Sequence, residues 1–214
     1  MSGQVGQVVD DGPIRIPCEW TPQVLCDALH FEATMIERSI GPGQKPTARL
    51  TLSHGLWFTP AIGRYGDLPW GEPKQCFRNS LLWAMLQPDR FIYCEGYAVG
   101  IIPIHHGWLI DRVTRAVVDL TWRERRFVYV GLPFRSEFLF HCYERDNRSI
   151  GNILGDYDLN FPAERGLYDW QSILHRPDEL PPGVLLPETP TPKTVDAQAL
   201  DRFVRSTLER NGDG

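Results

Sequence analysis

The sequence predicts an α+β domain with an antiparallel sheet, and two patterns support this prediction. Residues 76–86, CFRNSLLWAML, carry apolar side chains at helical spacing, and Pro88 ends the pattern. Four strand-like segments then follow one another along the chain: RFIYCEGYAVGII, IHHGWLID, RAVVDL and RFVYVGL. A helix that precedes several consecutive strands is typical of α+β domains whose strands run antiparallel.

The composition fits one globular domain and excludes several classes of partner. The chain has 214 residues, of which 42% are hydrophobic, so it is long enough to bury a core. Its net charge of −5 leaves no basic face for a nucleic acid backbone. No apolar run reaches the roughly 18 residues of a membrane helix, and the first residues lack the pattern of a secretory signal. We therefore expect a cytoplasmic protein with no nucleic acid and no membrane partner.

The cysteines give no sign of a disulfide framework or a zinc ribbon. They are Cys18, Cys26, Cys76, Cys94 and Cys142, an odd number without a CxxC pair. Cys26 and His30 lie four residues apart on one face of a predicted helix, so together with the pair His105–His106 they form a weaker metal-site hypothesis. No second ligand pair follows at finger spacing, and we expect neither a metal nor another cofactor.

Local signals divide the N-terminal part of the chain. Thr21 followed by Pro22 predicts the start of a helix over residues 21–40, which the Gly-Pro pair at 41–42 ends. The alternating apolar positions of residues 48–63 predict a strand. The Gly- and Pro-rich residues 63–75 predict a surface loop that leads into Cys76.

The C-terminal part predicts a linker and a last helix. Residues 1–180 form the predicted domain. Residues 181–193 are rich in proline, which removes backbone donors and extends the chain, so we expect an exposed linker there. Residues 194–214 predict an amphipathic helix, which would dock on the domain or bind a partner through its apolar stripe. The stripe consists of Val195, Leu200, Phe203, Val204 and Leu208.

The segments IHHGWLID and RAVVDL predict a hairpin that brings a histidine to an aspartate. If residues 112–113 form its loop, His106 lies directly opposite Asp119, with Cβ atoms about 5 Å apart. The carboxylate then accepts a hydrogen bond from the ring and fixes its tautomer. A slip of one residue would turn Asp119 to the other face. The alternative is a core histidine satisfied by a neighbouring acid. His105 points to the opposite face, where we expect a structural role.

Cys76 stands where the predicted helix begins. A helix N-terminus and a nearby imidazolium both favour the thiolate, which is the nucleophilic form of cysteine. The loop-to-helix pattern supplies the first condition, and His106 would supply the second if the sheet packs across the start of the helix. The alternative for Cys76 alone is a small buried residue of the core.

The ordered set of these residues resembles the transglutaminase-like branch of the papain-like cysteine enzymes. In that branch a cysteine at a helix start is followed by a His-Ala-Trp motif and then by an Asp-Pro-Thr-Trp motif. Here the matching residues are Cys76, His106-Gly107-Trp108 and Asp119-Leu120-Thr121-Trp122, within residues 75–122. The resemblance implies a papain-like fold with the catalytic helix packed on the sheet. It also implies Cys76 as nucleophile, His106 as base and then acid, and Asp119 as the residue that orients the ring.

Further residues are candidates for the oxyanion hole or the cleft. The family's Gly-x-Cys is replaced by Lys74-Gln75-Cys76, so the backbone N–H of Cys76 is the first candidate donor, and Gln75 or an indole such as that of Trp108 is the second. Glu95 either lines a cleft or faces solvent. Asn79, one helical turn after Cys76, is expected to bond a loop carbonyl rather than take part in catalysis.

The resemblance implies a cysteine-dependent acyl-transfer enzyme that forms a thioester intermediate. Protease, amidase or deamidase, and transglutaminase all share this chemistry, and a protein or peptide is the expected substrate. The alternative is a non-catalytic binding or inhibitory domain that retains the papain-like fold. The generic sequence around these motifs also resembles uncharacterised bacterial and phage proteins.

Overall fold

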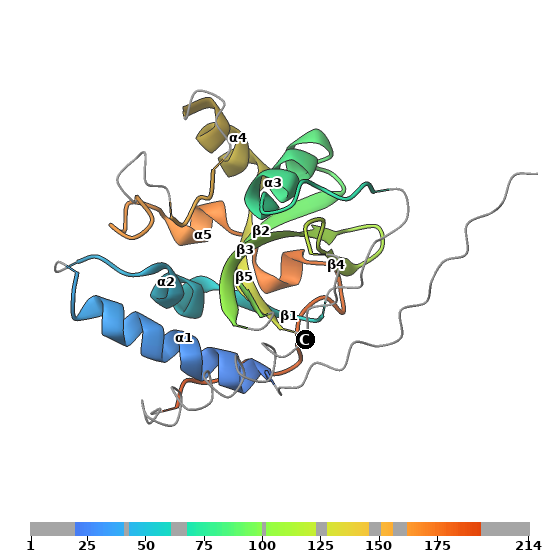
Figure 1. The fold of residues 1–214 in the computed structure, drawn as a ribbon. Coiled ribbons are helices and arrows are strands. Elements are labelled where there is room, and N and C mark those ends of the chain that lie inside the picture. The colour runs from blue at the N-terminus through green and yellow to red at the C-terminus, as the bar shows by residue number, and fades with distance from the viewer. Residues whose placement is uncertain are drawn as a thin grey trace, which may run out of the picture.

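The computed structural model describes residues 20–40, 43–60, 68–99, 102–122, 128–145, 151–155 and 162–193. Its centre is a five-stranded antiparallel sheet in the order β1-β5-β2-β3-β4 (Figure 1). The strands are β1 (Leu56–Phe58), β2 (Phe91–Val99), β3 (Pro103–Asp111), β4 (Ala116–Val118) and β5 (Tyr129–Phe134). The helices are α1 (Pro22–Glu37), α2 (Thr47–His54), α3 (Cys76–Leu86), α4 (Ser136–Arg145) and α5 (Trp170–Ile173). The predicted α+β class with an antiparallel sheet is confirmed.

Two predicted helix starts are confirmed. The Thr21 hydroxyl accepts a hydrogen bond from the Val24 N–H at 3.2 Å, and Pro22 is the first residue of α1. This helix buries Leu25 and Leu29 against the sheet residues Trp57, Tyr97 and Val130. Helix α3 begins at Cys76 and ends at Leu86, as its apolar spacing predicts.

The predicted strand over residues 48–63 is wrong in its first half. Residues 47–54 form α2, and the strand β1 covers residues 56–58, while residues 61–63 lie outside the described part of the chain. Ala48, Leu50 and Leu52 alternate along the sequence, but the helix buries Ala48, Leu50 and Thr51 instead. A short apolar run fits both periods, and Pro46 with an extended backbone starts the helix.

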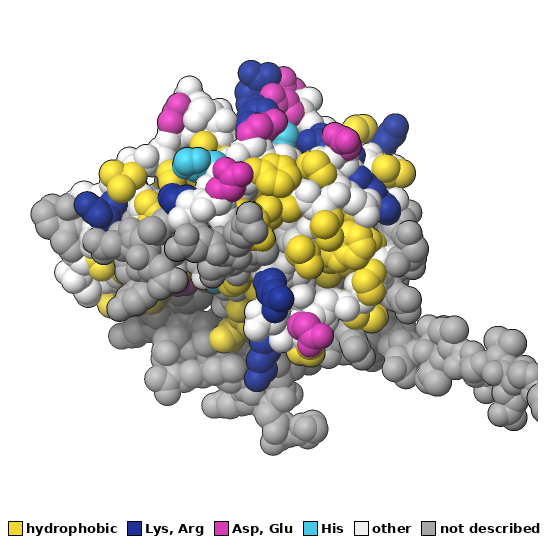
Figure 2. All heavy atoms as spheres, turned by 90° about the horizontal axis from the view of Figure 1, so that it is seen from above, with side chains coloured by type: hydrophobic (Ala, Val, Ile, Leu, Met, Phe, Trp, Pro, Cys, Tyr) yellow, Lys and Arg dark blue, Asp and Glu magenta, His cyan; other side chains and the backbone are white. Residues whose placement is uncertain are grey.

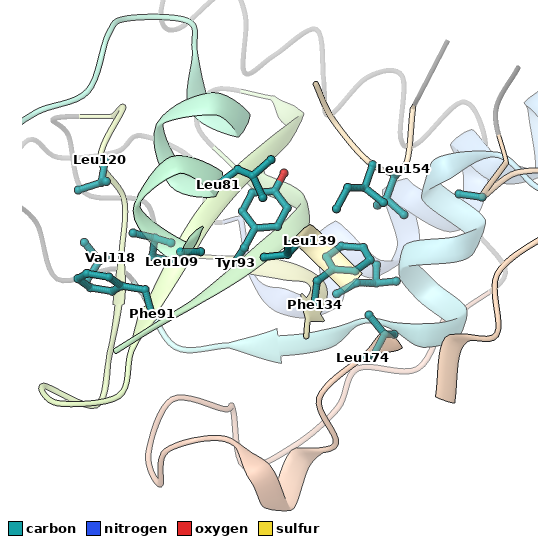
Figure 3. Close-up of a cluster of buried hydrophobic side chains, with 14 of the residues drawn as sticks. Leu81, Phe91, Tyr93, Leu109, Val118, Leu120, Phe134, Leu139, Leu154 and Leu174 are labelled. Atoms are coloured by element: carbon teal, nitrogen blue, oxygen red, sulfur yellow. The ribbon is translucent and has the colours of Figure 1, made fainter. Parts of the chain in front are cut away.

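Both faces of the central strands are covered, so β2 is buried along its whole length. On one face, Tyr93 of β2 and Leu109 of β3 pack against Leu81 of α3 (Figure 3). On the other face, Trp108 and Ile110 of β3 pack with Tyr129 of β5. His106 and Trp108 alternate with Gly107 and Leu109, so the histidine shares the face of the second cluster.

The β3–β4 hairpin has a longer loop than predicted. Ile110 pairs with Val117 and Asp111 with Ala116, so four residues, Arg112–Arg115, form the turn. The Asp111 carboxylate accepts the N–H of Val113 at 2.9 Å, and Arg115 takes the left-handed region at φ 56°. An Arg-Val pair favours no positive φ and cannot make the two-residue turn, which explains the longer loop.

The Pro-rich segment 181–193 differs from the predicted exposed linker. Val184 is fully buried with Phe58 and Tyr129, and its carbonyl accepts the Thr59 N–H at 2.9 Å. The N–H of Leu186 donates to the Trp57 carbonyl at 2.9 Å. Residues 184–186 contain no proline, so they can pair with the edge of β1 and fill its apolar face. The predicted helix over 194–214 lies outside the described residues.

The surface carries exposed apolar side chains on the outer sides of α3 and α4. Figure 2 shows apolar side chains grouped on the face that carries these two helices. The large apolar residues of α3 and α4 that are exposed are Leu82, Leu86 and Phe140. Among the described helices, none is long and apolar enough to cross a membrane.

Candidate active site

The close contact between α3 and β3 brings the nucleophile candidate to the histidine. A Cβ placed on Gly107 would lie 3.1 Å from the Phe77 Cα and 3.3 Å from the Cys76 carbonyl oxygen. The Ser80 hydroxyl, one turn further along the helix, donates to the Gly107 carbonyl at 3.1 Å. Because residue 107 has no side chain, the first turn of α3 can lie directly on the strand, and Cys76 reaches His106.

His106 interacts with both Asp119 and Cys76. Its Nε2 is 2.7 Å from Oδ2 of Asp119, and the thiol of Cys76 lies close enough to favour the charged ring. Burial disfavours the charged ring, but the interactions with Asp119 and Cys76 outweigh the cost of burial. Together they raise the pKa of His106 to about 9. At neutral pH the ring is therefore an imidazolium whose Nε2 is committed to Asp119.

Asp119 is held by four donors. Its Oδ1 accepts the backbone N–H groups of Thr121 at 2.9 Å and Trp122 at 3.0 Å. Its Oδ2 accepts His106 and the Tyr129 hydroxyl, the latter at 3.0 Å. Burial favours the neutral acid, yet the positive charge and hydrogen bond of His106 and the backbone N–H groups of Trp122 and Thr121 outweigh it and lower the pKa of Asp119. The buried carboxylate is therefore ionised and fixed in direction.

Aromatic rings enclose the imidazole. The Trp122 ring stacks on His106 with centroids 3.9 Å apart and planes 12° from parallel. The Trp108 ring is nearly parallel to the imidazole, with centroids 6.5 Å apart, and it makes a T-shaped contact with Tyr129. These rings leave the His106 side chain only 1% exposed. An aromatic face beside an imidazolium stabilises the positive charge and excludes water.

Asn79 has the expected contact with a loop carbonyl. Its amide donates to the Glu72 carbonyl at 2.8 Å and to the Thr121 hydroxyl at 2.9 Å, and it accepts the Glu72 N–H at 3.1 Å. The neighbouring Gly71 N–H donates to the Leu120 carbonyl at 2.8 Å. Asn79 thus joins the start of α3, the loop before Cys76 and the segment after Asp119. These hydrogen bonds hold the segment that carries Cys76 close to the segment that carries Asp119.

Glu95 lies on the opposite face of the sheet from His106 and is fully buried. It accepts the Tyr93 hydroxyl at 2.9 Å and the backbone N–H groups of Ile153 at 2.7 Å and Leu154 at 2.8 Å. His105 Nε2 lies 3.0 Å from its Oε1 without hydrogen-bond geometry, and the His105 ring packs on Phe77. Glu95 therefore faces neither solvent nor an open cleft but anchors residues 153–154 to the sheet.

The two side-chain candidates for the oxyanion hole differ in accessibility. Gln75 is exposed at the N-cap position of α3, and its side chain makes no cap bond to the helix. Trp108 is fully buried, its indole N–H finds no hydrogen-bond partner among the described residues, and its ring lies on Gly131. A substrate cannot reach that indole in this arrangement, so Trp108 forms the floor of the site and the exposed Gln75 stays a candidate.

The other cysteines are buried, and the described residues do not support the metal-site hypothesis. Cys26, Cys94 and Cys142 are buried, whereas Cys76 is partly exposed, and Cys18 lies outside the described residues. Burial raises the pKa of Cys94 well above its ordinary value, and burial with the charge of Asp27 raises the pKa of Cys26 to about 11. His30 contacts Arg49 at 3.1 Å, and no three His, Cys, Asp or Glu side chains of the described ranges are placed to hold a metal.

The sequence analysis missed Tyr129 and named Trp122 only as the last residue of the motif that begins at Asp119. The alternation of RFVYVGL places Tyr129 on one face of a strand, but the sequence does not say which strands lie between Tyr129 and Asp119.

No family model, no curated protein and no solved structure matches the chain. The chemistry of the site is therefore argued from its own geometry.

Proposed function

We propose that the protein is a cysteine-dependent acyl-transfer enzyme of papain-like design, with Cys76 as nucleophile, His106 as acid and base, and Asp119 as the orienting carboxylate. One observation carries the proposal. A partly exposed cysteine at a helix start interacts with an imidazolium, and a buried, ionised carboxylate holds that ring. An imidazolium attracts a thiolate, and a thiolate attacks carbonyl carbon.

In the first half of the reaction the thiolate of Cys76 attacks the carbonyl carbon of an amide. The carbonyl double bond opens to an oxyanion, for which the backbone N–H of Cys76 at the helix start is the nearest donor and Gln75 a second candidate. When the intermediate collapses, the carbon–nitrogen bond breaks, and the proton of His106 passes to the leaving amine. The products are a free amine and a thioester on Cys76.

In the second half, water or a second amine attacks the thioester. Neutral His106 accepts the proton of the attacking group, the carbon–sulfur bond breaks, and Cys76 leaves as a thiolate. Water gives a carboxylic acid, as in a protease or amidase, and an amine gives a new amide, as in a transglutaminase. Asp119 keeps the ring in place and balances its positive charge in both halves.

Substrate and compartment follow from the same chemistry. We propose a protein or peptide carboxamide as the acyl donor and the cytoplasm as the place of action, because a catalytic thiol needs reducing conditions. The chain needs no metal or other cofactor for these steps. The competing function is a binding or inhibitory domain of the same design, in which Cys76 is never acylated.

The decisive experiment is a competition between thiols for a small excess of iodoacetamide at pH 7, followed by mass-spectrometric mapping of the labelled peptide. Cys76 should be labelled at least tenfold faster than the buried Cys26, Cys94 and Cys142. His106→Ala should remove this advantage, because the positive partner of the thiolate is lost. Equal, slow labelling of all cysteines in the folded protein would contradict the proposed nucleophile.

Acylation is tested separately with a panel of peptide amides and thioesters. Intact-protein mass spectrometry should show an adduct of the acyl group in the wild type and none in Cys76→Ala. Adding an excess of a primary amine then separates hydrolysis from amide transfer by the mass of the released product. A reactive Cys76 that no acyl donor ever modifies would favour the binding domain.

A further inference from the structure

Tyr129 reaches the site from a strand outside the region that resembles known enzymes. It is the first residue of β5, pairs with Ala98 of β2, and is fully buried. Its hydroxyl donates to Oδ2 of Asp119 at 3.0 Å. That oxygen is also the acceptor for His106 at 2.7 Å. Two donors from two strands therefore meet at one oxygen.

The two oxygens of Asp119 are held in different ways. Oδ1 is bonded by backbone N–H groups two and three residues further along the chain, which fixes only the local turn. Oδ2 is bonded by side chains from β3 and β5, which ties that turn to the sheet. Without the Tyr129 hydroxyl, the described partners of Oδ2 would be reduced to His106. The Asp119 carboxylate could then rotate, and the His106 ring bonded to it would rotate with it.

We propose that Tyr129 is a positioning residue of this site: its hydroxyl holds Oδ2 of Asp119 beneath His106 and thereby keeps the imidazole aimed at Cys76. Tyr129 touches no substrate in this role. Its effect on turnover rests on the proposed function, whereas its effect on the Asp119–His106 pair holds in a binding domain as well.

The sign of the expected change follows from the groups around the pair. Within the described ranges, the titratable groups that interact with it are Cys76 from α3, His106 from β3, Asp119 after β4 and Tyr129 from β5. Removing a donor from a buried carboxylate makes the carboxylate more basic, so it attracts the proton of the imidazolium more strongly. The pKa of His106 should then rise above its value of about 9.

The test compares Tyr129→Phe with a matched control, Tyr93→Phe. Tyr93 is also fully buried and also donates to a buried carboxylate, Glu95 at 2.9 Å, but on the opposite face of the sheet. The readouts are the titration of the His106 ring by NMR and the pH dependence of Cys76 alkylation. Tyr129→Phe should raise the proton affinity of His106 by about tenfold, or one pH unit. Tyr93→Phe should leave the titration of His106 unchanged, since Tyr93 interacts with Glu95 and Cys76 but not with His106.

The outcomes separate this proposal from the enzymatic one. Equal titration of His106 in Tyr129→Phe and the wild type would overturn the positioning role, and so would an equal shift in both variants. If Tyr129→Phe does not fold, the Tyr129 hydroxyl proton of the wild type is observed instead. It should exchange slowly and change its chemical shift where His106 titrates, and fast exchange would contradict the role. Neither readout requires turnover. If the His106 titration shifts in Tyr129→Phe but the protein never forms an acyl adduct, the proposed enzymatic function is refuted and the positioning role of Tyr129 stands.

Discussion

His106 and Asp119 are joined by a 2.7 Å hydrogen bond although they are not paired in the sheet. Strand β4 ends at Val118, which pairs with Leu109, so the described ladder stops before it reaches His106. Asp119 is the first residue beyond the strand, and its side chain turns back to the face of His106. The edge of β3 beside His106 thus receives the carboxylate and the start of α3 instead of a paired strand.

Replacing Asp119 with Asn should keep the fold and abolish most of the reactivity. An amide cannot balance the charge of His106, and its NH₂ group can force the ring into the wrong tautomer, so turnover should fall by roughly three orders of magnitude. The measurement is the rate of acyl-adduct formation, or of Cys76 alkylation at pH 7.

Asp111→Asn is the matched control for this variant. Asp111 is equally buried at the other end of β3, where it is paired with Arg90 at 2.9 Å. That variant should lower stability but leave Cys76 reactive. Full reactivity of Asp119→Asn would show that Asp119 has a structural role only.

The Asp119–His106 pair should make stability depend on pH above neutrality. The pKa of His106 is about 9 in the folded protein and about 6.5 in an unfolded chain. A raised pKa stabilises the fold fully below about pH 6.5, and this contribution, on the order of 3 kcal/mol, disappears as the pH rises through about 9. The free energy of unfolding from denaturant titrations at pH 6.5, 8 and 9.5 measures the loss.

His106→Gln isolates this term, because glutamine still donates to Asp119 but does not titrate. The buried thiols Cys26 and Cys94 also destabilise the fold at high pH, since their raised pKa values mean that only the unfolded chain ionises them. They do so in both proteins. The difference between the two curves therefore belongs to His106, and parallel curves would contradict the raised pKa.

Glu95→Gln should destabilise the protein without changing the reactivity of Cys76. The amide keeps one oxygen but places an NH₂ group against a backbone N–H of residues 153–154, which costs about 1–3 kcal/mol. Thermal unfolding should shift down by several degrees, while the alkylation rate at 20 °C stays the same. A large loss of reactivity at a temperature where the variant is folded would assign Glu95 to the site.

The sequence predicted the elements of the site better than their pairing. Local spacing in the sequence was enough to predict that α3 starts at Cys76. It was also enough to predict that His106 and Asp119 share one face. The register was wrong by two positions, because the turn is set by the bonds of Asp111, but a slip of two restores the same face. The correct face was thus predicted from an incorrect turn.

Long-range contacts could not be predicted from spacing. Tyr129 reaches Asp119 only because β5 lies beside β2 and not beside β4, and this strand order has no local signal. The polarity of Glu95 suggested a cleft or solvent. It is buried because residues 153–154, which are distant in the sequence, donate their backbone N–H groups to it. Residues 48–54 fit both a helix and a strand, and packing against α1 and the sheet decided for the helix.

Truncation after Leu180 should unfold or strongly destabilise the protein, because the segment that follows belongs to the core. Val184 is fully buried in the cluster of Trp108 and Tyr129, which is the floor beneath His106. Losing it exposes that cluster and the edge of β1, at a cost of about 1.5–3 kcal/mol for the valine alone. Truncation after Lys193, which keeps residues 181–193, is the matched reference against which the loss of that segment is measured. Denaturant titrations of the two truncated proteins beside the full chain measure the effect. A fragment ending at Leu180 that is as stable as the full chain would show that residues 184–186 rest on the sheet without supporting it.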